Sequence, residues 1–211
     1  FHSYVLRCFL DGLGTAVPMG HNQLLKTIQA EIDETQEKSH LPADLVICIQ
    51  EQLKRIDGLQ DDIDHIGQRL GAMIREDRQM QALQQIPGVG DLTASALVAA
   101  VGDFCTFKTA RQFASWVGLV PRHVGTGWKT QQLGISKRGD TYLRTLLISG
   151  ARAVIARSGK SGWIERLLQR RHYNVVVVAL ANKMARTAWA VLARGMAFDR
   201  ARWNPLETVT A

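Results

Sequence analysis

The fold is decided by the stretch Leu83-Gln84-Gln85-Ile86-Pro87-Gly88-Val89-Gly90-Asp91-Leu92-Thr93-Ala94. An amphipathic, helix-like pattern runs into Pro-Gly-Val-Gly, and a second helical pattern begins at about Leu92. Because two glycines permit positive φ angles, we expect a tight turn that joins two helices. The chain is therefore predicted to be mainly α-helical around this point.

Such a turn leaves backbone N–H groups pointing outward at a helix N-terminus, where they suit an anion such as a phosphate. The pattern resembles a helix-hairpin-helix element, which holds nucleic-acid backbone rather than reading its sequence. An ordinary helix–helix turn is the alternative interpretation. The candidate nucleic-acid-binding residues here are Pro87, Gly88, Val89 and Gly90.

Upstream, the sequence predicts a long helix from about Asp44 to about Asp77. Its apolar residues from Ile56 onward follow a 3, 4, 3, 4, 3 spacing, which is a heptad seam with charged residues outside. We expect this seam to pair either with a short preceding helix or with another protomer. Residues 21–79 are interpreted as a helical, coiled-coil arm without chemistry of its own. The seam consists of Ile56, Leu59, Ile63, Ile66, Leu70 and Met73.

The charge of the chain changes sign near residue 80. Residues 1–80 carry 8 Lys and Arg against 13 Asp and Glu, whereas residues 81–211 carry 18 against 6. A half with a net charge of +12 suits a polyanionic partner, DNA or RNA, but charge alone equally allows a merely soluble basic protein. The few acids after residue 80 are scattered, so no metal site is expected in this chain.

The cysteines and the apolar segments indicate a cytoplasmic protein. The 3 cysteines are widely spaced and predict reduced thiols rather than disulfides or a zinc site. The apolar run Val175–Leu180 is too short for a membrane span and predicts a buried helix. Trp116, Trp163 and Trp189 lie among apolar residues and are expected in the core. Arg152 and Lys183 either line a nucleic-acid groove or lie on a solvated helix face.

A second basic segment follows between residues 114 and 144. Its glycines and Pro121 exclude one continuous helix and predict a turn or short β-hairpin, followed by a helix that starts near Asp140. Phosphate binding by its cations is the plain interpretation, and a hydroxyl nucleophile set among them is the alternative. The cations are Arg122, Lys129, Lys137, Arg138 and Arg144, and the hydroxyls are Thr126, Ser136 and Thr141.

Four motifs in a fixed order carry a family resemblance. They read I-P-G-V-G (86–90), F-A-S-W-V-G-L-V-P-R (113–122), G-I-S-K-R-G-D-T-Y-L-R-T-L-L-I-S-G-A-R-A (134–153) and A-L-A-N-K-M-A-R-T-A-W-A-V-L (179–192). Together they resemble the transposases of insertion-sequence families 110, 116 and 902, especially the 1111-type subgroup. The resemblance covers roughly residues 80–195, so residues 80–211 are interpreted as a C-terminal transposase domain.

This resemblance implies an architecture and partners that composition does not show. Family members join an N-terminal ribonuclease-H-like domain, which holds Mg²⁺, to this C-terminal domain through the coiled-coil arm. They assemble as homo-oligomers through the arm and use a structured non-coding bridge RNA to choose DNA. Residues 1–20 resemble only the end of the first domain, so we expect this sequence to be incomplete and its Mg²⁺ to belong to the missing part.

The resemblance also implies a serine nucleophile for DNA strand exchange. Relatives read P-R-Q-H-S-T-G-G-K where residues 121–129 read P-R-H-V-G-T-G-W-K. The expected serine falls at Gly125 or at Thr126, which makes Thr126 the first candidate for the catalytic hydroxyl and Ser136 the second. The predicted function is DNA transposition or recombination. A non-catalytic nucleic-acid-binding and dimerisation remnant is the alternative, and a coiled-coil adaptor would leave the basic half unexplained.

Overall fold

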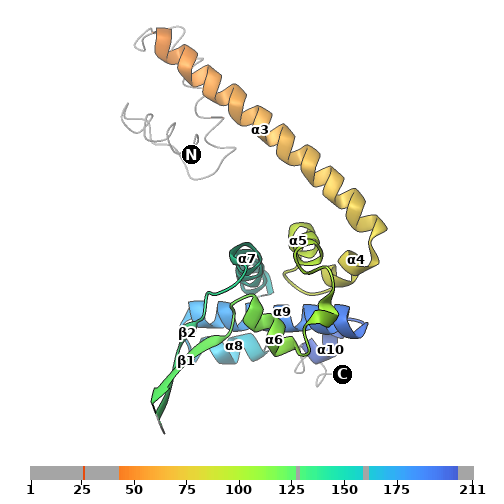
Figure 1. The fold of residues 1–211 in the computed structure, drawn as a ribbon. Coiled ribbons are helices and arrows are strands. Elements are labelled where there is room, and N and C mark those ends of the chain that lie inside the picture. Colours follow the sequence, from red (N-terminus) through yellow and green to blue (C-terminus); the bar gives the residue numbers. More distant parts are fainter. Residues whose placement is uncertain (1–25, 27–42, 127–128, 159–161, 204–211) are drawn as a thin grey trace. The chain divides into compact units, whose positions relative to one another are not determined.

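The computed structural model describes residues 26, 43–126, 129–158 and 162–203, and it is mainly helical with one two-stranded sheet (Figure 1). The predicted mainly α fold is confirmed. The chain divides into two compact units, residues 1–69 and 70–211. The division falls within the long helix, before the boundary expected from composition at residue 80. The expected domain remnant over residues 1–20 lies outside the described residues.

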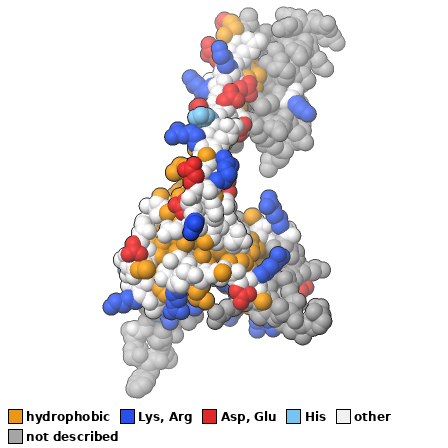
Figure 2. Space-filling view, turned by 90° about the vertical axis from the view of Figure 1, so that its right-hand side faces the viewer, with side chains coloured by type: hydrophobic (Ala, Val, Ile, Leu, Met, Phe, Trp, Pro, Cys, Tyr) orange, Lys and Arg blue, Asp and Glu red, His pale blue; other side chains and the backbone are white. Residues whose placement is uncertain are grey.

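The long helix α3 (Ala43–Glu76) confirms the predicted arm helix. Asp44 in its first turn and Arg75 in its last complement the helix dipole. Its surface carries both acidic and basic side chains (Figure 2). Four apolar side chains of the heptad seam are about half exposed or more, namely Leu59, Ile63, Ile66 and Met73.

Two helices flank the glycine turn, as predicted. They are α4 (Arg78–Gln84) and α5 (Asp91–Val101). The Asp77 carboxylate caps α4 by accepting the N–H groups of Gln79 and Met80 at 2.7 and 3.1 Å. This cap separates α4 from α3 and lets Met80 and Leu83 enter the core of the second unit.

The rest of the second unit surrounds one central helix, α9 (Tyr173–Arg194), which packs against α4, α6, α7 and α8. Thr109 caps α6 by accepting the Gln112 N–H at 3.1 Å, and Asp140 caps α7 through the Leu143 N–H at 2.9 Å. The remaining elements are η1 (Phe104–Thr106), α6 (Ala110–Trp116), β1 (Pro121–Thr126), β2 (Lys129–Ile135), α7 (Thr141–Ser158), α8 (Gly162–Leu168) and α10 (Arg200–Trp203).

Helix α9 is long and apolar enough to cross a membrane by length and composition alone. Half of that apolar window is buried inside the protein, as in the core helix of many soluble proteins. The buried helix predicted from the valine run is confirmed, because Val176, Val177 and Leu180 lie in the core. Among the tryptophans, Trp189 is buried as expected, whereas the core position expected for Trp116 is wrong because its side chain is 37% exposed.

Candidate nucleic-acid interface

Strands β1 and β2 form an antiparallel hairpin that projects from the helices of the second unit (Figure 1). This confirms the predicted β-hairpin. Pro121 pairs with Ile135 at its base and Thr126 pairs with Lys129 near its tip. The register shifts between Pro121 and His123, so Arg122 lies at an irregularity of the kind that re-aims a side chain. Residues 121–138, which we call the basic hairpin, carry four Lys and Arg and no Asp or Glu.

Two glycines anchor the base of the basic hairpin. Gly118 has a φ of +84° and Gly139 a φ of +102°, and both values favour glycine. A Cβ at Gly139 would lie 1.7 Å from the carbonyl oxygen of Trp116, and one at Gly118 would lie 2.1 Å from that of Arg138. The segments before β1 and after β2 therefore touch backbone to backbone. The Ser136 N–H donates to the Val120 carbonyl at 2.9 Å across the same contact.

Arg144 was expected to bind nucleic acid, but the structure buries it at 8% exposure. Its guanidinium donates to the carbonyl of Val117 at 3.0 Å and to Thr141 Oγ1 at 3.1 Å. A buried Arg with these partners stabilises the loop that leads into β1. Arg144 is therefore not available to contact phosphate.

The remaining described cations of the basic hairpin face solvent. Arg122, Lys137 and Arg138 are exposed, and no acidic side chain of the described residues pairs with them. Lys137 has a φ of +53°, which is uncommon for a residue other than glycine, and its N–H donates to the Gly118 carbonyl at 3.2 Å. The hairpin base therefore holds the backbone of Lys137 in an energetically unfavourable conformation. The exposed side chains of Arg122, Lys137 and Arg138 are available to bind an anion.

The two hydroxyl candidates differ in their surroundings. Ser136 Oγ is buried and has no hydrogen-bond partner among the described residues. A nucleophile must reach its substrate, so this position does not suit Ser136 for attack on DNA. The backbone of Thr126 ends β1, beside the exposed Gly125. The side chains of Thr126 and Lys129 lie outside the described part of the structure.

The glycine turn at residues 86–90 packs against helices α7 and α9. A Cβ at Gly88, whose φ is +86°, would lie 2.8 Å from the Gly150 carbonyl oxygen and 2.9 Å from Met184 Cε. Val89 is buried and only Gly90 of the turn is exposed. Asp91 places a carboxylate at the start of α5, where it accepts from Gln84 Nε2 at 2.6 Å. This packing accounts for Gly88 but not for Gly90, where an added Cβ would meet nothing within 4 Å. Phosphate binding by Pro87–Gly90 stays a prediction.

The described residues do not supply a metal-binding donor set. No three His, Cys, Asp or Glu side chains gather within the part of the chain that the structure describes. The Mg²⁺ implied by the family resemblance therefore does not fit these residues.

Comparisons with known proteins point to one transposase family. A family model described as "Transposase IS116/IS110/IS902 family" matches residues 80–168. A "Probable family 20 transposase" of Pseudomonas aeruginosa is 45% identical over 176 residues, covering 81% of this chain and 51% of the relative. The transposase for insertion sequence element IS1328 of Yersinia enterocolitica is 36% identical over 200 residues, covering 92% and 58%.

A third relative represents the 1111-type subgroup. The transposase for insertion sequence element IS1111A of Coxiella burnetii is 46% identical over 132 residues, which cover 60% of this chain and 36% of the relative. The chain spans about half the length of the curated relatives it matches first.

Proposed function

Because this chain belongs, through residues 80–168, to the IS116/IS110/IS902 transposase family, we propose that it forms part of a DNA transposase and supplies its nucleic-acid-binding surface. The observation that carries this proposal is the basic hairpin, whose described cations are exposed and unpaired among the described residues. The function is DNA transposition by recombination, carried out in the bacterial cytoplasm where the DNA lies.

The basic hairpin binds the sugar–phosphate backbone of DNA. Arg122 presents a planar fork of donors to phosphate oxygens, and Lys137 and Arg138 add charge at the hairpin base. Such contacts fix position and orientation without reading sequence. Sequence choice is left to a structured bridge RNA, which we propose as a second partner on the strength of the family resemblance. The strong excess of positive charge after residue 80 suits both polyanions.

We assign the nucleophile of strand exchange to Thr126 rather than to Ser136, since Ser136 Oγ is buried. Thr126 Oγ attacks a DNA phosphorus, a new O–P bond forms, and one phosphodiester P–O bond breaks. The hydroxyl proton is lost to solvent, and the leaving deoxyribose oxygen takes up a proton. The DNA end is then held as a phosphothreonine ester, which the hydroxyl of another strand can displace.

Neutralising the hairpin cations tests the binding proposal. We expect R122Q/K137Q/R138Q to weaken binding to a labelled DNA duplex by at least about tenfold, because about three phosphate contacts are lost. The matched control R78Q/R157Q/R171Q removes the same charge from exposed positions on α4, on α7 and after α8. Fluorescence anisotropy measures both, and an equal loss in the control would show that total charge alone drives binding.

We also propose that the arm mediates self-association, because Ile63 and Ile66 of the heptad seam are each 61% exposed on α3. Burying two such rows against each other removes apolar area from water. In analytical ultracentrifugation we expect a dimer or larger assembly for the native chain and a monomer for I63E/I66E.

The control for the arm variant is H65E/Q68E, which adds the same charges at exposed positions beside the seam. It should retain the native assembly. A native chain that stays monomeric at high concentration, or a control that dissociates equally, contradicts a role of the seam in assembly.

A non-catalytic remnant is the second candidate function. Gly125 favours it, because glycine stands at one of the two positions where the family resemblance places the serine. Such a protein would still bind nucleic acid through the basic hairpin and self-associate through the arm, but would leave DNA strands intact. Replacement of Thr126 by alanine separates the two functions, because only the catalytic protein depends on that hydroxyl for strand exchange.

A further inference from the structure

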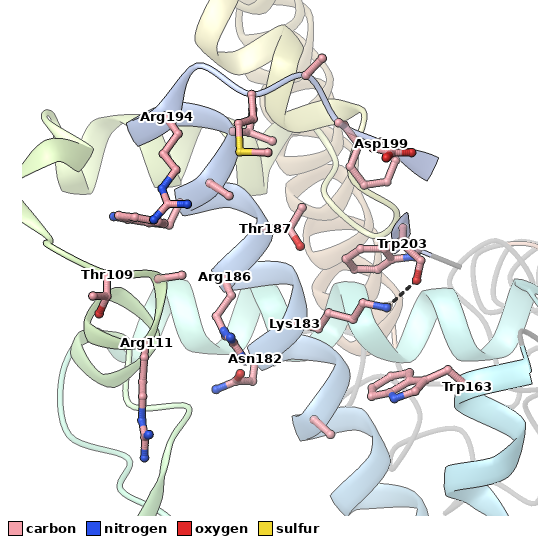
Figure 3. A pocket seen from close by; sticks show the side chains of 18 residues that line it. Thr109, Arg111, Trp163, Asn182, Lys183, Arg186, Thr187, Arg194, Asp199 and Trp203 are labelled. Atoms are coloured by element: carbon pink, nitrogen blue, oxygen red, sulfur yellow. Dashed lines mark hydrogen bonds between the residues drawn. The ribbon is translucent and has the colours of Figure 1, made fainter. Parts of the chain in front are cut away.

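A cavity of about 1090 Å³ opens along α9, between α6, α8 and the segment that ends in α10 (Figure 3). Its volume is that of pockets that hold small ligands. None of its lining residues belongs to the basic hairpin or to the glycine turn, and most lie beyond residue 168, where the family match ends. The cavity is therefore a separate place on the molecule.

Lys183 lines the cavity on the side of Trp163 and Trp203. Its ammonium lies 4.9 Å from the ring centre of Trp163 and 4.5 Å from that of Trp203, and it donates to the Trp203 carbonyl at 2.5 Å (Figure 3). Burial lowers the pKa of Lys183. These contacts commit Lys183 to holding α8 and α10 against α9. It stabilises the wall of the cavity rather than serving as a free cation.

Three arginines give the cavity its charge. In Figure 3 the side chains of Arg186 and Asn182 lie beside each other on α9, Arg111 extends from α6, and Arg194 lies near the end of α9. Asp199 is the acidic residue of the lining, and its carboxylate already accepts the Ala201 N–H at 2.9 Å at the start of α10. No acidic side chain of the described residues pairs with Arg111 or Arg186. A concave site with this excess of cations attracts an anion.

A cation–π pair of Arg194 and Trp189 adds a flat surface beside these cations. The Arg194 guanidinium lies 5.1 Å from the ring centre of Trp189, and Trp189 is fixed because its indole N–H donates to the Phe107 carbonyl at 3.0 Å. Trp189 is buried, whereas Arg194 is exposed. An exposed guanidinium plane of this kind can stack on a nucleobase.

We propose that this cavity binds unpaired nucleotides of a nucleic-acid strand, with phosphates on Arg111 and Arg186 and a base stacked on Arg194. That the ligand is a nucleic acid rests on the proposed function. The location of the site and its preference for unpaired nucleotides go beyond that function. A base inside a duplex has both faces covered by its neighbours, so only an unpaired nucleotide offers a free face to Arg194. DNA and RNA single strands share this chemistry.

Unstructured oligonucleotides test the proposal with the full chain. Labelled oligothymidylate and oligouridylate of about ten nucleotides, the size of typical single-strand sites, are titrated alongside a DNA duplex. We expect R111Q/R186Q to weaken oligonucleotide binding about tenfold and duplex binding less than about twofold. The control R78Q/R157Q should leave both nearly unchanged. Comparing the two oligonucleotides shows whether the strand is DNA or RNA.

Crosslinking locates the bound strand. An oligonucleotide that contains 4-thiothymidine should crosslink to residues 109–116 or 182–203, as mapped by mass spectrometry. Crosslinks confined to residues 121–138, or equal losses in the control variant, overturn the proposal. If the native chain binds duplex but no oligonucleotide, this inference fails and the proposed function stands. If it binds neither, both fail.

Discussion

Replacing Thr126 by alanine in the complete protein is expected to reduce DNA strand exchange by at least about a hundredfold, because a covalent mechanism cannot proceed without its nucleophile. Thr126→Ser should retain or raise activity, since serine keeps the hydroxyl and removes a hindering methyl group. A gel assay of strand exchange on labelled donor and target DNA measures both. The same reactions run under protein-denaturing conditions should show DNA bound covalently to the native protein and to Thr126→Ser, but not to Thr126→Ala.

Ser136→Ala is the control for the loss of a hydroxyl. Its Oγ is buried and has no hydrogen-bond partner among the described residues, so removing it should leave strand exchange near the native rate. Unchanged exchange in Thr126→Ala would refute the assignment of the nucleophile. Absence of exchange in the native complete protein, together with gained activity in Gly125→Ser, would identify the chain as part of a decayed enzyme.

Gly139→Ala is expected to destabilise the second unit by roughly 3 kcal/mol or more, because an alanine there would suffer both backbone strain and a steric clash. The φ of Gly139 is +102°, and a Cβ there would lie 1.7 Å from the Trp116 carbonyl oxygen. Relief of the clash requires the two backbone segments at the hairpin base to separate. Thermal unfolding followed by circular dichroism should show a melting temperature lower by about 6 °C or more.

Two other glycines separate the causes of this loss. Gly102 has a φ of +63° and a ψ of -81°, with nothing within 4 Å of an added Cβ, so Gly102→Ala measures backbone strain alone and should cost roughly 1–3 kcal/mol. Gly134 also has open space and no positive φ, so Gly134→Ala should change stability little. If Gly139→Ala and Gly134→Ala have the same melting temperature, the backbone contact at the hairpin base does not stabilise the protein.

Local sequence patterns predicted most of the elements of the fold. The heptad spacing predicted α3, the Pro-Gly-Val-Gly turn predicted the break between α4 and α5, and the glycines around Pro121 predicted the hairpin. These features depend on helical period and on backbone freedom, which are properties of neighbouring residues. The order of the motifs likewise indicated the family, which the comparisons confirmed.

The partners of individual side chains depend on contacts between distant segments, and the sequence could not predict them. Arg144 looked like a member of a cationic cluster, but its guanidinium reaches the Val117 carbonyl 27 residues away. Gly88 looked like part of a phosphate nest, but it lies against Gly150 of α7. The cavity is also non-local, because Trp203 meets Lys183 only once α10 has folded back on α9.

The salt dependence of duplex binding tests the central claim, that the basic hairpin neutralises DNA phosphates, most directly. Fluorescence anisotropy between about 50 and 200 mM salt gives the slope of log Kd against log salt, which is close to one per phosphate contacted. We predict tight binding with a steep slope for the native chain, and a slope smaller by about 2 to 3 for R122Q/K137Q/R138Q. No duplex binding at low salt, or an unchanged slope in this variant, would contradict the claim.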